Sequence, residues 1–225
     1  MPPPARQTRV VSGLDSAPAA AVPGVVPLAS MMTAPPSGLR VALIRHPPAR
    51  IEAGLCYGRL DLGLAPGAAE RVTALAAALR AFPARRIWTS PTRRCAEPAA
   101  MLGAALGLAP VADPRLLELD FGAWEGLAWD AVPRAALDRW AADPLGFAPP
   151  GGESGAALIT RVRGFAATLR ARGEDCVVVA HGGPLRLLPA LLRGEAPDLL
   201  APAPAQGALT FVEAVAFPGP APEQA

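Results

Sequence analysis

Lysine and asparagine are both missing from the 225 residues of this chain, and all 21 basic residues are arginine. The lack of lysine excludes Schiff-base catalysis, covalent attachment of pyridoxal phosphate and the lysine of a P-loop. The lack of asparagine leaves no acceptor for N-linked glycosylation. Histidine occurs twice and cysteine three times, with no CxxC pair. The composition therefore argues against a zinc site and against a disulfide framework.

What the chain does contain is a large share of apolar residues and a nearly balanced charge. Hydrophobic residues make up 52% of the chain, enough for a substantial core, and the formal net charge is +2. So small a charge gives no reason to expect nucleic acid as a partner. No apolar run reaches the length of a membrane span. The cysteines Cys56, Cys95 and Cys176 are expected to be buried, reduced thiols of a cytoplasmic protein, with Cys95 serving packing although it follows Arg94.

Proline and alanine dominate both ends of the chain. Residues 1–38 show no hydrophobic period, so we predict a disordered extension there, one domain over residues 39–217 and a disordered tail over residues 218–225. A signal peptide with its apolar core at residues 17–28 is the alternative, but three prolines interrupt that core.

Both histidines follow short apolar runs. Residues 41–44 lead to Arg45 and His46, and residues 176–180 lead to His181. Each run indicates a buried strand that delivers its last residues to a loop. A single histidine so placed would be a loop residue without a role. Because ligands bind at the carboxyl ends of strands in α/β sheets, two such histidines predict a paired site.

Predicted helices alternate with predicted strands along the chain. Helices are expected over residues 66–82, 91–106, 155–172 and 184–193, and further strands at 86–89, near 111 and at 209–217. Ser90 is expected to cap the second helix, and Pro98 to kink it. Residues 124–140 resemble a lid with one short helix from Pro133. The alternation predicts an α/β protein, a three-layer α/β/α sandwich with a mostly parallel central sheet.

Four motifs, in this order, resemble those of the histidine phosphatase superfamily, also called phosphoglycerate mutase-like. They are Arg45-His46, Ser-Pro-x-x-Arg at residues 90–94, LLELDFGAWEG around Glu118, and Val-Ala-His-Gly-Gly around His181, and together they span about residues 40–194. Residues 54–62, the LDFGAWEG segment and residues 149–154 are similar to those of α-ribazole phosphatases. The resemblance implies a phosphoglycerate mutase-like fold, no metal or other cofactor, and a small-molecule phosphate ester as substrate. It implies hydrolysis through a phosphohistidine, with α-ribazole 5′-phosphate of cobalamin biosynthesis as the narrower substrate.

The resemblance also implies the catalytic residues. His46 is the nucleophile, since an imidazole can attack phosphorus near neutral pH. His181 binds the phosphoryl group and stabilises its charge. Glu118 is the general acid and later the base, and Asp120 and Glu125 are weaker alternatives for that role.

Phosphate binding is assigned by the same motifs. Arg45 and Arg94 are expected to hold the phosphoryl group, because the planar arginine fork binds phosphate at two points and stays charged. Arg93 is the alternative to Arg94 and is expected to be solvated. Gly182 allows close approach of the backbone at the start of a helix. Arg59 is expected to bind phosphate or the rest of the substrate.

Two residues depart from the family pattern, and two others have competing roles. Pro47 stands where glycine is usual and supplies no N–H, so one backbone contact to phosphate is in doubt. Leu117 stands where related phosphatases often carry arginine. Glu153 and Ser154 could contact substrate, although Ser154 is equally suited to cap a helix.

Other functions remain as alternatives. A broad-specificity phosphatase has the same motifs. A phosphoglycerate mutase is less compatible, because the region between Glu118 and Gly151 is short. A non-catalytic phosphoryl-binding module would lack the nucleophile or the acid, and both His46 and Glu118 are present. A serine hydrolase is disfavoured because no Gly-x-Ser-x-Gly motif occurs.

Overall fold

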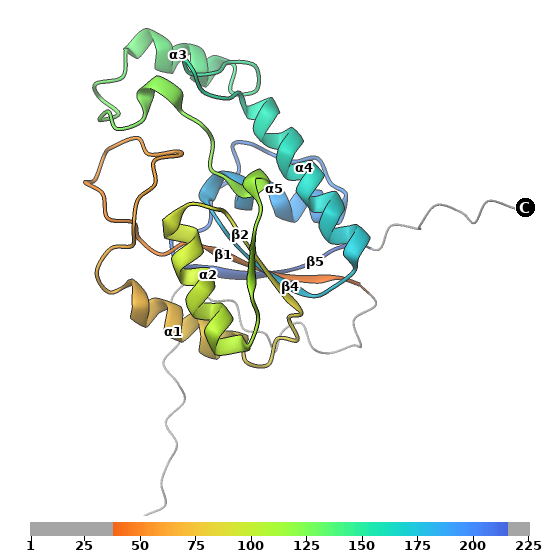
Figure 1. Cartoon of the computed structure of the whole chain (residues 1–225). Coiled ribbons are helices and arrows are strands. Elements are labelled where there is room, and N and C mark those ends of the chain that lie inside the picture. The colour runs from red at the N-terminus through yellow and green to blue at the C-terminus, as the bar shows by residue number, and fades with distance from the viewer. Residues whose placement is uncertain (1–37, 216–225) are drawn as a thin grey trace, which may run out of the picture.

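The computed structural model describes residues 38–215 and arranges them around one sheet of five strands (Figure 1). The strands are β1 (Arg40–Arg45), β2 (Arg86–Thr89), β3 (Pro110–Ala112), β4 (Cys176–Ala180) and β5 (Leu209–Glu213). Their order is β3-β2-β4-β1-β5, and only β5, paired with β1 at the edge, is antiparallel. The predicted mostly parallel sheet is confirmed. The last strand ends at Glu213 rather than at the predicted residue 217. The extension predicted for residues 1–38 and the tail predicted for residues 218–225 lie outside the described residues, apart from residue 38.

Helices cover both faces of this sheet, as predicted for a three-layer sandwich. The helices are α1 (Ala68–Leu79), α2 (Arg93–Leu106), α3 (Arg134–Ala142), α4 (Gly155–Arg172) and α5 (Gly182–Arg193). α1 and α2 pack on one face and α4 and α5 on the other, while α3 lies at one end of the molecule (Figure 1). Within the part of the chain that the structure describes, none of the helices has the length and apolar character of a membrane span.

The central strands are buried on both sides because each faces two layers of helices. Along β1, Ala42 and Ile44 pack with α1 and α2, whereas Val41 and Leu43 pack with α4 and α5. Successive side chains of a strand point to opposite faces. A strand between two helical layers must therefore be apolar throughout, which explains the unbroken apolar runs that precede both histidines.

The start of α2 differs from the prediction. The helix begins at Arg93 with Thr92 as its N-cap residue, so Ser90 does not cap it. Pro98 lies inside the helix, which continues to Leu106. α5 likewise begins earlier than expected, at Gly182 directly after His181.

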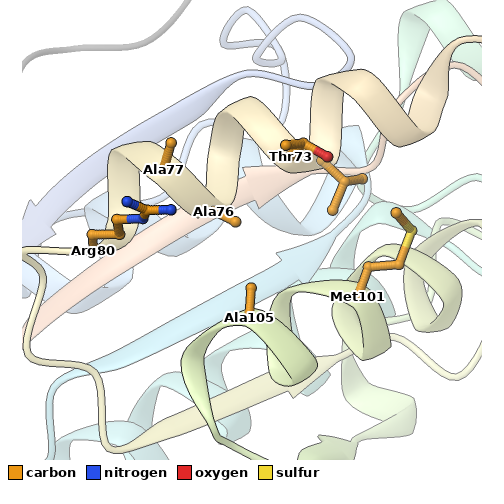
Figure 2. Close-up of a pocket in the computed structure, with 7 residues that line it drawn as sticks. Thr73, Ala76, Ala77, Arg80, Met101 and Ala105 are labelled. Carbon is orange, nitrogen blue, oxygen red and sulfur yellow. The ribbon is translucent and has the colours of Figure 1, made fainter.

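A shallow groove of about 220 Å³ lies between α1 and α2. Small or apolar side chains and one arginine line it, namely Val72, Thr73, Ala76, Ala77, Arg80, Met101 and Ala105 (Figure 2). None of these residues is a histidine or a carboxylate. The groove therefore offers no imidazole or carboxylate for acid–base chemistry.

Candidate active site

The two histidines lie at the carboxyl ends of adjacent parallel strands. β1 and β4 pair in register with Arg45 opposite Ala180, so His46 and His181 follow side by side. Their ring centroids are 5.2 Å apart and the planes meet at 66°. Both side chains are buried. The structure thus brings together the pair that the strand ends predict.

His46 is held in one tautomer by its neighbour in the chain. Its Nδ1 lies 2.7 Å from the carbonyl oxygen of Pro47. Because a carbonyl oxygen only accepts, Nδ1 carries the proton and Nε2 keeps its lone pair. Burial, together with Arg94 and Arg45, lowers the pKa of His46 to about 3, although the hydrogen bond to Pro47 acts in the opposite direction. A neutral imidazole with an unprotonated Nε2 is the form that can act as a nucleophile.

His181 is anchored from the end of β2 and the start of α2. Its Nε2 lies 2.8 Å from Oγ of Ser90 and 3.3 Å from Oγ1 of Thr92. Burial lowers the pKa of His181 well below its usual value, so the ring is neutral. Sγ of Cys95 lies 3.5 Å from the same Nε2, and burial raises the pKa of this thiol to about 12. The packing role expected for Cys95 is confirmed, and Cys56 and Cys176 are buried free thiols as well.

Two arginines beside the histidines have no carboxylate partner. They donate to backbone carbonyls, Arg45 to Pro204 at 2.7 Å and Arg94 to Leu60 and Gly58 at 2.5 and 2.6 Å. The Nε atom of each is buried without a partner, and neither guanidinium forms an ion pair within residues 38–215. Arg94 is fully buried. A buried cation without a counter-charge is costly, so the pair is suited to an anionic ligand.

The other two arginines considered from the sequence form ion pairs. Arg93 is exposed and pairs with Glu97 one turn further along α2. Arg59 lies 3.1 Å from Asp120 and 3.1 Å from Glu153. Arg94 rather than Arg93 therefore faces the histidines, and the guanidinium of Arg59 is already neutralised by two carboxylates.

A cavity of about 130 Å³ opens at these strand ends, and we call it the phosphoryl cavity. Two arginines, one histidine and one glutamate line it, namely Arg45, Arg94, His46 and Glu118. The other residues that line it are Leu55, Tyr57, Gly58, Phe121 and Trp129. It is smaller than the roughly 300–1,000 Å³ typical of pockets for drug-sized ligands. One potential nucleophile, two cations and one carboxylate thus surround a space for a small anionic group.

Glu118 reaches this cavity from the loop between two short 3-10 turns, η2 (Pro114–Leu116) and η3 (Gly122–Trp124). Its Oε1 accepts hydrogen bonds from the N–H of Leu119 at 2.9 Å and of Gly183 at 3.0 Å. A Cβ atom at position 183 would lie 2.2 Å from that oxygen. The second glycine after His181 therefore leaves room for the Glu118 carboxylate at the start of α5.

Arg161 on α4 holds the segment that carries Glu118. Its guanidinium donates to the carbonyl oxygens of Arg115, Leu117 and Glu118 at 2.8, 2.5 and 3.0 Å. Backbone carbonyls in an irregular loop need such partners when they are withdrawn from water. One side chain thus fixes the path of the loop at three of the four residues from 115 to 118.

A row of alternating charges extends from Arg161 across the same wall. Arg161 pairs with Glu153, Glu153 with Arg59, and Arg59 with Asp120. The row joins α4 to the loop after β1 and to the segment that follows Glu118. Glu153 is thus a structural carboxylate in this structure, and the adjacent Ser154 caps α4 by accepting the N–H of Ala157 at 3.3 Å.

The alternative acids do not reach the phosphoryl cavity. Asp120 accepts the N–H of Gly122 at 2.9 Å in addition to its pair with Arg59. Oε1 of Glu125 accepts the N–H of Arg59 at 2.7 Å and of Phe121 at 3.1 Å. Neither residue lines the cavity, so Glu118 is the carboxylate that faces it.

Sequence reasoning missed the roles of Ser90, Thr92 and Arg161. A usable signal existed for Ser90, because it directly follows β2, the neighbour of β4, and therefore lies at the same edge of the sheet. Arg161 is one arginine among several on α4, and no motif distinguishes it. Between residues 38 and 215, no three His, Cys, Asp or Glu side chains cluster in a way that could hold a metal ion.

Comparison with known proteins agrees with this geometry. The family model of the histidine phosphatase superfamily (branch 1) matches residues 41–214. The chain is 33% identical over 167 residues to glucosyl-3-phosphoglycerate phosphatase of Mycobacterium tuberculosis, covering 68% of this chain and 74% of that protein. It is 29% identical over 162 residues to phosphoserine phosphatase 1 of Hydrogenobacter thermophilus, covering 69% and 77%. The structure of α-ribazole phosphatase from Shigella flexneri superposes with a TM-score of 0.69 at 26% identity, covering 79% and 94%. The chain therefore belongs to the histidine phosphatase superfamily and is a phosphatase.

Proposed function

We propose that this phosphatase hydrolyses small phosphate monoesters by transferring the phosphoryl group to Nε2 of His46. The observation that carries the proposal is the phosphoryl cavity, where a neutral His46 lies beside two arginines that form no ion pair with any residue between 38 and 215. A phosphate monoester carries about two negative charges at neutral pH. It would supply the counter-charge that Arg45 and Arg94 lack, and that charge must be neutralised before phosphorus can be attacked.

The first chemical step forms a bond from Nε2 of His46 to phosphorus and breaks the bond from phosphorus to the ester oxygen. The leaving oxygen takes a proton from the carboxyl group of Glu118, which enters this step protonated. The proton on Nδ1 of His46 stays bonded to the carbonyl of Pro47, so the imidazole develops its positive charge next to an acceptor.

The second step returns the enzyme to its starting state. Water attacks phosphorus, the Glu118 carboxylate accepts a proton from that water, and the bond between phosphorus and His46 breaks. Inorganic phosphate leaves, and Glu118 is again protonated. The hydrogen bond from the N–H of Gly183 holds the Glu118 carboxylate at the edge of the cavity.

The remaining site residues support these groups. Gly182 leaves space for Arg45, because a Cβ at that position would lie 3.2 Å from the arginine Cζ. His181 packs behind His46, and direct contact with the phosphoryl group requires it to exchange its bond with Ser90 for a phosphoryl oxygen. We propose that Arg59, neutralised by Asp120 and Glu153, holds its loop in place and does not bind phosphate.

The substrate is proposed as an ester of a small alcohol. The names of the relatives point to such esters for those proteins, namely phosphoserine, glucosyl-3-phosphoglycerate and α-ribazole phosphate. α-Ribazole 5′-phosphate is the candidate supported by residues 54–62 and by the Shigella structure, and a broad range of small esters is the alternative.

The test is to trap the covalent intermediate. Purified protein is mixed with a ³²P-labelled ester for milliseconds and quenched in alkali, and the label is mapped by peptide analysis. Phosphohistidine survives base and is lost in acid, so base-stable label on His46 is expected. His46→Ala should show neither label nor turnover. Label on a different residue, or turnover by His46→Ala, would reject the proposed nucleophile.

A further inference from the structure

A second cavity, of about 190 Å³, adjoins the phosphoryl cavity, and we call it the alcohol cavity. Arg45, Glu118 and Phe121 line both spaces. These three residues therefore form the common boundary. Nothing in the mechanism above uses the second space, although the proposed general acid stands at its edge.

The walls of the alcohol cavity are mainly apolar. They come from the loop after Glu118, from α3, from α4 and from the segment after α5, and include Leu119, Trp140, Leu158 and Leu199. Such walls favour the apolar body of an organic group over a hydrated ion. The cavity is also too small for a macromolecule, so its occupant is a compact chemical group.

Besides Arg45 at the common boundary, a second arginine without a carboxylate partner among residues 38–215 lies in these walls. Arg186, on α5, makes one hydrogen bond, from Nη1 to the carbonyl oxygen of Leu199 at 2.6 Å. Its Nε is buried and has no partner, and no carboxylate pairs with it among residues 38–215. Most other half-buried arginines of the chain have a carboxylate, as Arg40 has Asp175. A half-buried arginine whose charge is not balanced by the protein is suited to an anion from outside.

We propose that the alcohol cavity binds the leaving group of the substrate and that Arg186 binds a carboxylate on that group. This inference rests on the proposed phosphatase function, because it needs the phosphoryl group to lie against His46. With the phosphoryl group there and Glu118 next to the ester oxygen, the carbon skeleton extends past Glu118 into the adjoining space. Arg45 is occupied by the phosphoryl group, so Arg186 is the cation that remains for the alcohol part.

The charges of the two cavities indicate the chemical class of the substrate. Arg45 and Arg94 balance a phosphoryl dianion, and the single charge of Arg186 balances one further monoanion. The planar guanidinium matches the planar carboxylate. The favoured substrate is therefore a phosphate ester of a small, partly apolar hydroxy acid. α-Ribazole, the leaving group of the candidate ester named above, is a neutral alcohol and would leave Arg186 without a counter-charge, so the charges of this cavity favour a hydroxy acid over it.

The test compares esters that differ only in the carboxylate. Benzyl phosphate supplies an apolar body and an alkoxide leaving group, and its meta- and para-carboxylated derivatives add the anion without altering the reacting atoms. A hydrogen bond to a charged group is strong enough for a preference of roughly tenfold or more. Wild-type kcat/KM should favour at least one carboxylated ester over benzyl phosphate by that factor. A preference below about twofold for both isomers would overturn the inference without any variant.

The residue assignment is tested by the same ratio in variants. Arg186→Gln should reduce the carboxylate preference to near unity, and Arg186→Lys, which keeps the charge, should retain part of it. Arg193→Gln is the matched control, because Arg193 lies on the same helix, is exposed and pairs with Glu195. It should leave the ratio unchanged. If Arg186→Gln kept the carboxylate preference, another residue would bind the carboxylate and the role of Arg186 would be rejected.

The outcomes separate this inference from the proposed function. Turnover of benzyl phosphate with no carboxylate preference would leave the phosphatase mechanism intact and remove only the role of the alcohol cavity. Absence of turnover for these esters and also for p-nitrophenyl phosphate would overturn both proposals.

Discussion

The site has a floor at the strand ends and a wall above it, and the two are built differently. The floor consists of Arg45, His46, Ser90 and His181, and each of these residues ends a strand of the sheet or directly follows one. Its geometry follows from pairing, since β1, β4 and β2 are parallel neighbours and bring their ends to one edge. Strand pairing thus places all four residues of the floor at one edge of the sheet.

The wall consists of Glu118 and the charged row of Arg161, Glu153, Arg59 and Asp120. None of these residues lies in a strand, and the loop that carries Glu118 has only three residues of 3-10 turn on either side of it. Side chains from a distant helix hold this loop through its backbone carbonyls. Changes in the floor should therefore affect chemistry directly, whereas changes in the wall should act by moving Glu118.

Glu118→Gln changes the residue of the wall that is proposed to donate the proton, and among the wall substitutions it should have the largest effect. Glutamine keeps the acceptor for the Gly183 N–H but supplies no proton. General acid catalysis typically contributes ~10²–10⁴-fold, so single-turnover cleavage of an alkyl phosphate should fall by that range. Cleavage of p-nitrophenyl phosphate should fall much less, since p-nitrophenolate leaves without a proton. Equal losses on the two esters would show that Glu118 only positions the substrate, and Asp120 would be tested next.

Gly183→Ala tests whether the position of Glu118 matters apart from its identity. The new Cβ would lie 2.2 Å from Oε1 of Glu118, so the carboxylate must swing away. A displacement of about 1 Å can cost on the order of 10²-fold in rate. We expect a loss of that size on alkyl phosphates with little change in melting temperature, because alanine suits a helix better than glycine.

Gly164→Ala is the matched control for this substitution. Gly164 lies in α4, and the nearest atom to its added Cβ is Nη1 of Arg115 at 3.8 Å, an ordinary contact. This variant should keep full activity on both classes of ester. Full alkyl phosphatase activity in Gly183→Ala would mean that the bond between Glu118 and Gly183 is not needed.

The contrast between floor and wall also explains what the sequence could predict. The apolar runs before His46 and His181 carry a strong signal, because a strand between two helical layers has to be apolar on both faces. Ser90 was assigned to helix capping because serine is a good N-cap residue. In the folded protein its hydroxyl bonds to His181 instead, and Thr92 takes the N-cap position. The preference of serine for the N-cap position was thus outweighed by a hydrogen bond to His181, 91 positions away in the sequence.

The wall could be predicted only in part. Glu118 was found through its motif, but Arg161 lies 43 residues from the carbonyl that it binds in Glu118, and nothing near it in the sequence marks the contact. The motifs predict Arg59 as a ligand of phosphate or of the rest of the substrate, and Asp120 as a weaker alternative to Glu118 as the acid. Their pairing with each other depends on how the two loops meet, which no periodicity or capping rule encodes.

Arg161→Ala tests the support of the wall and should have a moderate effect. The substitution leaves three backbone carbonyls without their arginine donor and leaves Glu153 with Arg59 as its remaining ion-pair partner. An unsatisfied buried group costs about 1–3 kcal/mol. The free energy of unfolding should fall by about that amount in urea titrations. Activity should fall more on alkyl phosphates than on p-nitrophenyl phosphate, because the loop that carries Glu118 is loosened. Arg163→Ala, exposed on the same helix, is the control. Equal losses on both esters would show that Arg161 does not act through Glu118.

The smallest expected effect concerns the floor and its two neutral histidines. Burial lowers the pKa of His46 from 6.5 to about 3 and the pKa of His181 well below 6.5, whereas both titrate near 6.5 when the chain is unfolded. Below pH 6.5 the unfolded chain therefore binds protons that the folded chain does not. By linkage, the free energy of unfolding is highest above pH 6.5 and falls as the pH decreases toward 3.

The measurement is the free energy of unfolding in urea at pH 7 and at pH 5.5, a window that lies above the range in which carboxylates ordinarily titrate. Each histidine should account for a loss of about 1 kcal/mol over this window. His46→Gln removes one titrating group and should recover about half of the loss, without any change in the charged row of the wall. If the wild type lost no stability between pH 7 and 5.5, both histidines would have to accept their protons in the folded state. In that case the neutral imidazole on which the proposed attack by His46 depends would exist only near and above neutral pH.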